Sequence, residues 1–151
     1  MRLLLATDAW TPQVNGVVVS IRNTLDCLRR QGHEAMVIEP GQFRTIPCPS
    51  YPEIRLALGP ARGVTRAIES FAPDAIHIAT EGPLGLATRR HCVRNGIPFT
   101  TAYHTQFPRY IRARIALPLA WTYRWLRWFH GPSQAVMTAT LAMREELVQQ
   151  G

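Results

Sequence analysis

The first thirty residues contain the pattern that most restricts the fold of this chain. Residues 3–6 (LLLA) form a short apolar run without polar alternation, which predicts a strand buried on both faces. A polar loop over 7–16 follows, and the apolar-rich stretch from Val17 predicts a helix that stops at Gly32. A buried strand, a loop and a helix form the first half of a βαβ unit, in which ligands bind at the carboxyl ends of the strands.

The same alternation continues along the chain. Further strands are predicted at 34–39, 53–58, 75–79, 98–102 and 135–138, and a proline-rich loop at 40–52. Helices are predicted at 62–71, 84–94 and 141–150, with a helical stretch at 111–130 that Pro118 interrupts. Alternating strands and helices predict an α/β fold, with a Rossmann-like parallel sheet covered by helices on both faces. The expected strand order is 3-2-1-4-5-6, which makes the first and fourth strands neighbours.

Three polar loops are expected to meet at one edge of this sheet. They cover residues 8–16, 80–83 and 103–108, and each follows a predicted strand. Gly16 would let a ligand approach the backbone closely, and the first-turn N–H groups of its helix would face an anion. Glu81 has two interpretations of equal weight: it accepts hydrogen bonds from a hydroxylated ligand, or it stabilises the start of the next helix.

Composition argues against a cysteine-based metal site, a secreted protein and a membrane-spanning protein. All 17 basic residues are arginine, against 10 acidic residues, so the formal charge is +7. Coding bias and bidentate anion binding both remain explanations for this choice. The three cysteines show no metal-type spacing and are expected to be free thiols in a reducing compartment. The N-terminal apolar run is too short for a secretory signal and no run reaches ~18–20 apolar residues, so we expect a cytoplasmic location, either in solution or peripheral on the inner membrane face.

The sequence offers little support for a dinucleotide cofactor or a bound metal. Glu39 ends the second strand, where an acid can bind a ribose, but the first loop lacks the G-x-G-x-x-G pattern of dinucleotide-binding folds. No histidine stands at a metal-ligand spacing, so no metal is expected. His77, inside a strand, is interpreted as a hydrogen-bonded core residue. His104 lies in an exit loop, where it either contacts a ligand or bonds the local backbone.

Arginine and aromatic residues are mixed over 109–130. Trp121, Trp125, Trp128 and Phe129 have the spacing of one helical face. This face either packs on the sheet or lies at a membrane surface with arginines on anionic lipid. Single-stranded nucleic acid is a third and weaker option. The residues assigned to a membrane or partner surface are Arg112, Arg114, Trp121, Arg124, Trp125, Arg127 and Trp128.

Six segments of the sequence, in order, carry a family resemblance: TDAWTPQVNGVVVSI (7–21), RQGHE (30–34), PDAIHIATEGPLG (73–85), YHTQFPRY (103–110), WTYRWLRWFH (121–130) and TLAMREELVQQG (140–151). Together they resemble the N-terminal half of a GT-B glycosyltransferase of family four (group 1). The nearest subfamily holds bacterial α-mannosyltransferases and sulfoquinovosyl-type lipid glycosyltransferases.

The resemblance implies a retaining transfer, without metal, of a sugar such as mannose from a GDP- or UDP-linked donor to a lipid or glycan acceptor. It places the donor at Gly16 and its neighbours Asn15 and Val17, and the donor sugar at His104, the implied catalytic residue. The acceptor side would be formed by Asp8, Glu81, Gly82 and Thr105.

The resemblance has one departure. The family binds its nucleotide mainly through an E-x7-E motif in a C-terminal domain, and Glu145 and Glu146 do not replace that motif. We therefore expect residues 1–151 to be an acceptor-binding domain, without the donor-binding domain and inactive alone. A non-catalytic binding module of the same fold and, more remotely, an oxidoreductase are the alternatives; nucleic acid is not an expected partner.

Overall fold

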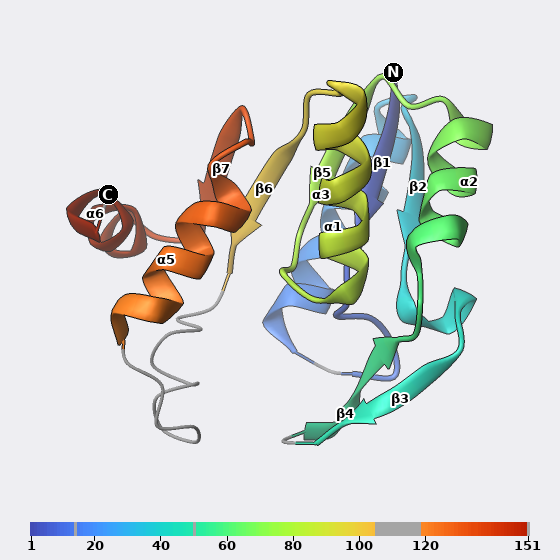
Figure 1. The fold of residues 1–151 in the computed structure, drawn as a ribbon. Helices are drawn as coiled ribbons and strands as arrows, with labels where there is room; N and C mark the ends of the chain where they lie inside the picture. The colour runs from blue at the N-terminus through green and yellow to red at the C-terminus, as the bar shows by residue number, and fades with distance from the viewer. Residues whose placement is uncertain (14, 50, 105–118, 151) are drawn as a thin grey trace.

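A five-stranded parallel sheet forms the centre of the molecule (Figure 1). The computed structural model describes residues 1–13, 15–49, 51–104 and 119–150. Each pair of neighbouring strands is parallel, and the order is β2-β1-β5-β6-β7. The strands are β1 (Arg2–Ala6), β2 (Glu34–Ile38), β5 (Ala75–Ile78), β6 (Thr100–Tyr103) and β7 (Ala135–Thr138). The predicted adjacency of the first and fourth predicted strands, now β1 and β5, is confirmed.

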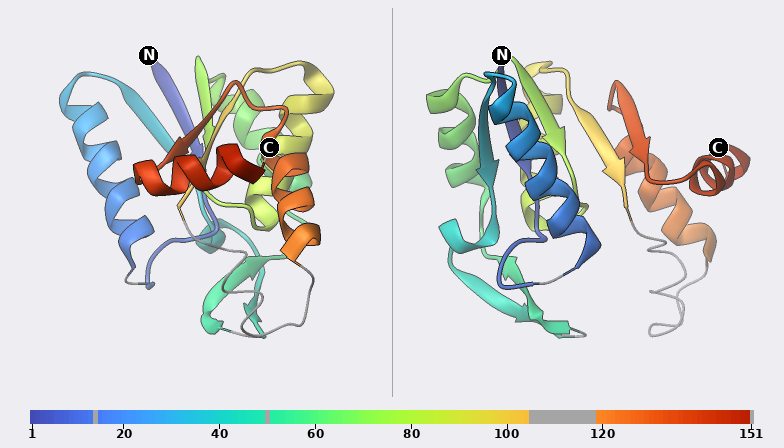
Figure 2. Two further views of the ribbon diagram at one scale, coloured as in Figure 1. Left: turned by 90° about the vertical axis from the view of Figure 1, so that its left-hand side faces the viewer. Right: turned by 180° about the vertical axis from the view of Figure 1, so that it is seen from behind.

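Helices cover both faces of the sheet, as predicted. They are α1 (Gly16–Arg30), α2 (Ala61–Phe71), α3 (Pro83–Asn95), α5 (Leu119–His130) and α6 (Leu141–Gln150). Figures 1 and 2 show α1 on one face and α2, α3 and α5 on the other. Leu5 packs with Ile21 and Leu25 of α1, whereas Leu4 and Ala6 join the core on the opposite face. Strand β1 is therefore apolar throughout because successive side chains enter two different cores.

The prediction that the third strand (53–58) belongs to this sheet is wrong. It forms β4 (Tyr51–Ala57), which pairs antiparallel with β3 (Thr45–Cys48) inside the segment predicted to be loop. The strand order is therefore the expected one without its third member. Prolines are tolerated here because a two-stranded hairpin leaves an open edge on each strand. Figure 1 shows this hairpin projecting from the end of the molecule at which β1 and β6 finish.

Asp8 ties the end of β1 to the start of α3. Its carboxylate accepts hydrogen bonds from Leu84 N (2.9 Å), Thr80 Oγ1 (2.9 Å) and Gly85 N (3.3 Å). The side chain is buried, and burial raises its pKa, while the hydrogen bonds from Leu84 and Thr80 act in the opposite direction. A Cβ on Gly82 would collide with the Asp8 carboxyl group, so the helix start can approach this closely only with glycine there.

His77 of β5 is half-buried, and its Nδ1 lies 2.8 Å from Thr100 Oγ1 on the neighbouring strand. The hydrogen bond predicted for His77 is confirmed, although the side chain lies at the margin of the core and not inside it. Burial lowers its pKa to about 4, and the charge of His104 acts in the same direction. Between about pH 4 and pH 6.5, His77 is therefore mostly neutral in the folded protein and mostly protonated in the unfolded chain.

Replacing Asp8 by asparagine should destabilise the protein. The amide nitrogen cannot accept from the buried Gly85 N–H, and an unsatisfied buried donor costs about 1–3 kcal/mol in free energy of unfolding. Urea unfolding followed by circular dichroism measures the loss. Asp26→Asn, on the exposed side of α1, is the matched control and should change stability by less than about 0.5 kcal/mol. Equal losses in both variants would contradict the assigned role.

Stability should fall as the pH drops from about 6.5, where an unperturbed histidine titrates, to about 4, where folded His77 does. In this window the unfolded state binds the additional proton, so acid favours unfolding. His77→Asn keeps a polar nitrogen near the Nδ1 position but does not titrate. Between about pH 7.5 and about pH 5 the native chain should lose roughly 1–2 kcal/mol more than this variant in urea titrations. Parallel losses would exclude His77 as the source.

Candidate functional site

The loops that follow β1 and β5 meet at the carboxyl edge of the sheet, together with the residue after β6. The hydrogen bond from Asp8 N to Thr80 Oγ1, at 2.7 Å, joins the first two loops directly. His104 follows β6, the next strand of the sheet. The predicted convergence of the first two loops is confirmed. Three of the predicted residues, Thr105, Arg112 and Arg114, lie outside the described residues.

The start of α1 offers backbone donors at this edge. Asn15 caps the helix by accepting from Val18 N at 3.0 Å, and it leaves the N–H groups of Gly16 and Val17 without an acceptor among the described residues. A Cβ placed on Gly16 would meet no atom within 4 Å. Gly16 therefore faces open space, and the orphan amides of a helix start there are suited to an anion.

The structure bears on the two interpretations of Glu81, because a different residue binds the N–H groups at the start of α3. The N-cap of α3 is Gly82, which provides no side-chain cap, and the helix N–H groups are instead bound by Asp8. Asp8 is buried at this edge, where it binds Thr80 and the start of α3. Its role in acceptor binding stays a prediction. The Glu81 side chain does not cap α3, so it is available to contact another group.

Glu81 lies beside a histidine that sequence reasoning did not select. Glu81 Oε1 is 3.4 Å from Nε2 of His130, and these two side chains are 12% and 8% exposed. His130 Nδ1 lies 2.8 Å from Thr101 Oγ1, and Thr101 Oγ1 donates to Ser133 Oγ, which donates to the His130 carbonyl. Thr101 is therefore left to accept from Nδ1, so the ring carries a proton on Nδ1 and presents Nε2 to Glu81.

His104 completes the group. Its side chain is half-buried, and burial lowers its pKa, while the Glu81 carboxylate partly offsets that effect. The site thus combines the His104 imidazole, which favours its neutral form, with the Glu81 carboxylate, which lies beside a His130 Nε2 that has no hydrogen-bond partner among the described residues. This pair can exchange hydrogen bonds with the hydroxyls of a ligand. In the described part of the chain, no three histidine, cysteine or acidic side chains gather to bind a metal; metal-independent chemistry stays a prediction.

The aromatic face of α5 is divided. Trp125 stacks on Phe129 with ring centroids 5.6 Å apart and packs against the core, whereas Trp121 and Trp128 are 69% and 53% exposed. Each of the two alternatives stated for this face therefore fits a part of it, because the helix packs Trp125 and Phe129 against the core and leaves Trp121 and Trp128 exposed. Arg124 and Arg127 of the same helix are also exposed.

Arg89 of α3 links α3 to the end of α5, and sequence reasoning also missed it. Its Nε donates to Phe129 O at 2.8 Å, its terminal nitrogen donates to Trp128 O at 2.5 Å, and its guanidinium lies 3.9 Å from the centre of the Trp128 ring. The side chain is buried, and burial lowers its pKa. A sequence signal existed, since Gly85, Arg89 and Cys92 share one helical stripe.

No helix in the described ranges has the length and apolar character required to cross a bilayer.

Comparison with known proteins agrees with this architecture. The sequence profile described as Glycosyltransferase Family 4 matches residues 14–151. The chain is 31% identical to a GDP-mannose-dependent alpha-mannosyltransferase of Mycobacterium tuberculosis, over 100% of this chain and 45% of the relative. It is 32% identical to an alpha-monoglucosyldiacylglycerol synthase of Streptococcus pneumoniae, over 74% of this chain and 28% of the relative.

The chain spans less than half the length of these relatives. Its parallel sheet with helices on both faces is that of the N-terminal half of a GT-B fold. With the profile match over almost all of its residues, the chain belongs to glycosyltransferase family 4.

Proposed function

We propose that residues 1–151 form the acceptor side of a retaining glycosyltransferase that transfers a sugar, mannose first among the candidates, to a lipid or glycan. The observation that carries this proposal is the meeting of the loops after β1 and β5 through the Asp8 N–Thr80 Oγ1 hydrogen bond, at the sheet edge where Glu81 and His104 follow neighbouring strands and α1 begins. A carboxylate and an imidazole can hold sugar hydroxyls, and free helix amides can hold a phosphate.

The roles follow from these positions. Gly16 and Val17 donate backbone N–H groups to the donor phosphates, with Asn15 fixing the helix start that presents them. His104 contacts the transferred sugar as the catalytic residue, and Glu81 accepts from an acceptor hydroxyl. Asp8 and Gly82 hold the Glu81 loop in place through α3.

The names of the relatives support the choice of substrates. The match to a GDP-mannose-dependent alpha-mannosyltransferase supports GDP-mannose as the donor over a UDP-linked sugar. The match to an alpha-monoglucosyldiacylglycerol synthase, whose named product is a glycolipid, supports a lipid acceptor. Recognition of the nucleotide is assigned to a second domain, which corresponds to the remainder of these relatives. Residues 1–151 alone are therefore proposed not to turn over the donor.

The purified chain should release no GDP from GDP-mannose at an enzymatic rate. When fused to the C-terminal remainder of the Mycobacterium tuberculosis relative, it should transfer mannose, and His104→Ala should lower kcat by about 100-fold or more. His33→Ala, in the turn between α1 and β2, is the control and should leave kcat unchanged. Turnover by the isolated chain would overturn the acceptor-side assignment. A folded chimera that binds sugar but never transfers it would favour a non-catalytic binding module.

The exposed part of α5 motivates a peripheral membrane site as a second element of the proposal. Trp121 lies on the helix surface together with Arg124, and the chain carries a formal charge of +7. Interfacial tryptophan and arginine bind anionic headgroups, and the attraction weakens as salt screens the charges. Such a surface would bring a lipid acceptor to the edge that holds Glu81.

Vesicles that contain phosphatidylglycerol should bind the chain at low salt and release it as salt is raised. The double variant Trp121→Ser with Arg124→Gln should weaken binding by about tenfold or more, because one basic side chain alone contributes ~1 kcal/mol near such a surface. Val93→Ser with Arg94→Gln removes an exposed apolar and a basic residue from α3 and is the matched control. No binding at low salt, or equal weakening by both pairs, would contradict a membrane role for α5. Co-sedimentation gives the measurement.

A further inference from the structure

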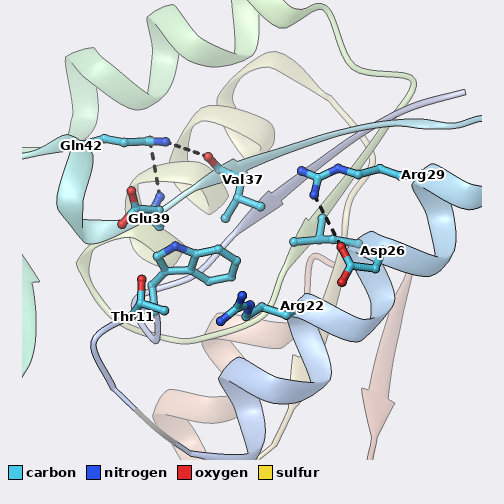
Figure 3. A pocket seen from close by; sticks show the side chains of 9 residues that line it. Thr11, Arg22, Asp26, Arg29, Val37, Glu39 and Gln42 are labelled. Atoms are coloured by element: carbon cyan, nitrogen blue, oxygen red, sulfur yellow. Dashed lines mark hydrogen bonds and ion pairs between the residues drawn. The ribbon is translucent and has the colours of Figure 1, made fainter.

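A separate cavity lies between α1 and the carboxyl end of β2. Its volume is about 430 Å³, within the usual size range of small-molecule pockets. Figure 3 shows Arg22, Asp26 and Arg29 reaching it from α1, with Glu39 and Gln42 on the side of β2. The remaining wall includes Trp10, from the loop after β1. None of these residues belongs to the Glu81–His104 group.

The apolar part of the wall is an aromatic ring with two aliphatic side chains. Trp10 is half-buried and packs against the core formed by α1 and β1, and Leu25 and Val37 line the cavity beside it. A fixed indole that borders a polar cavity offers its face to the C–H groups of a ring, while the ring's polar substituents remain free for hydrogen bonds.

Most of the polar groups in the cavity already have partners. Glu39, considered above as a ribose ligand, accepts from Gly41 N at 2.6 Å through Oε2, and Gln42 donates to Val37 O at 2.9 Å. Arg29 lies 3.8 Å from Asp26. Arg22 has no hydrogen-bond or ion-pair partner within the described ranges. The groups left for a ligand include the Arg22 guanidinium, as donor, and the second oxygen of Glu39, as acceptor.

These groups select a neutral polyhydroxylated ring over an anion. Two arginines are balanced by two acids in the lining, so the cavity has no net formal charge with which to concentrate an anion. A hydroxyl both donates and accepts, and it can therefore bind Arg22 and Glu39 at the same time. Trp10 adds the apolar surface that the face of a sugar ring can cover.

We propose that this cavity binds a non-reacting sugar ring of the acceptor glycan, and this inference rests on the proposed function. Trp10 and Asp8 stand two residues apart on one loop, so a bound chain of sugars can continue from the cavity toward the Glu81–His104 edge. The cavity then extends acceptor recognition beyond the sugar that receives the transferred residue.

Titration of the 151-residue chain with methyl α-mannoside and with methyl α-glucoside, followed by ¹H–¹⁵N NMR, tests the proposal. At least one sugar should shift the Trp10 indole N–H and the amides around Arg22 in a saturable way, with a Kd in the millimolar range. Trp10→Phe assigns the indole signal. Arg22→Ala should weaken binding by tenfold or more, whereas Arg30→Ala, in the last turn of the same helix, should leave it unchanged.

Other outcomes overturn the inference in distinguishable ways. Shifts confined to Glu81 and His104 would place the sugar in the transfer site, overturning this cavity as a subsite while supporting the proposed function. Shifts around Arg22 with inorganic phosphate but not with either sugar would make the cavity an anion site. No saturable shift with either sugar would also overturn it. Sugar binding at Trp10 in a chain whose chimera fails to transfer mannose would support the cavity and refute the proposed function.

Discussion

The buried carboxylate of Asp8 is the interaction on which the arrangement of the edge depends. It receives two backbone N–H groups from the start of α3 and the hydroxyl of Thr80, so one side chain joins β1, the loop after β5 and a helix. Because Asp8 supplies the charge that the helix start favours, Glu81 is not required there. The geometry of Glu81 is therefore a consequence of Asp8, and both depend on the absence of a side chain at Gly82.

The parallel sheet could be predicted because its physical cause is visible in the sequence. Strands buried on both faces are apolar without alternation, and β1 sends Leu4 and Leu5 into two separate cores. The hairpin of β3 and β4 could not be found in this way. Pro47 and Pro52 indicate loop by every local rule, and only the free edges of an isolated two-stranded ribbon make them acceptable in strands.

The position of the candidate site at the carboxyl edge of the sheet could be predicted from the sequence, but the contacts between its residues could not. Topology alone brings the loops after β1 and β5 together, so the meeting of these two loops could be predicted. The role of Asp8 depends on a contact between residues 8 and 84, and that of His130 on a hydroxyl chain through Thr101 and Ser133. Such contacts arise from tertiary packing and leave no local pattern. The buried position of Arg89 did leave one, in its helical stripe.

The order of strands also governs the order in which the chain can fold during its synthesis. Strand β1 can pair with β2 once Ile38 has been made, but its other neighbour, β5, is complete only at Ile78. At a translation rate of ~5–20 residues per second this interval is roughly 2–8 s. During that time β1 has an open edge, and the Asp8 carboxylate is hydrated by water. The nascent chain can thus pass through a stage in which two of the five strands, β1 and β2, are paired while the other edge of β1 is open to other strands.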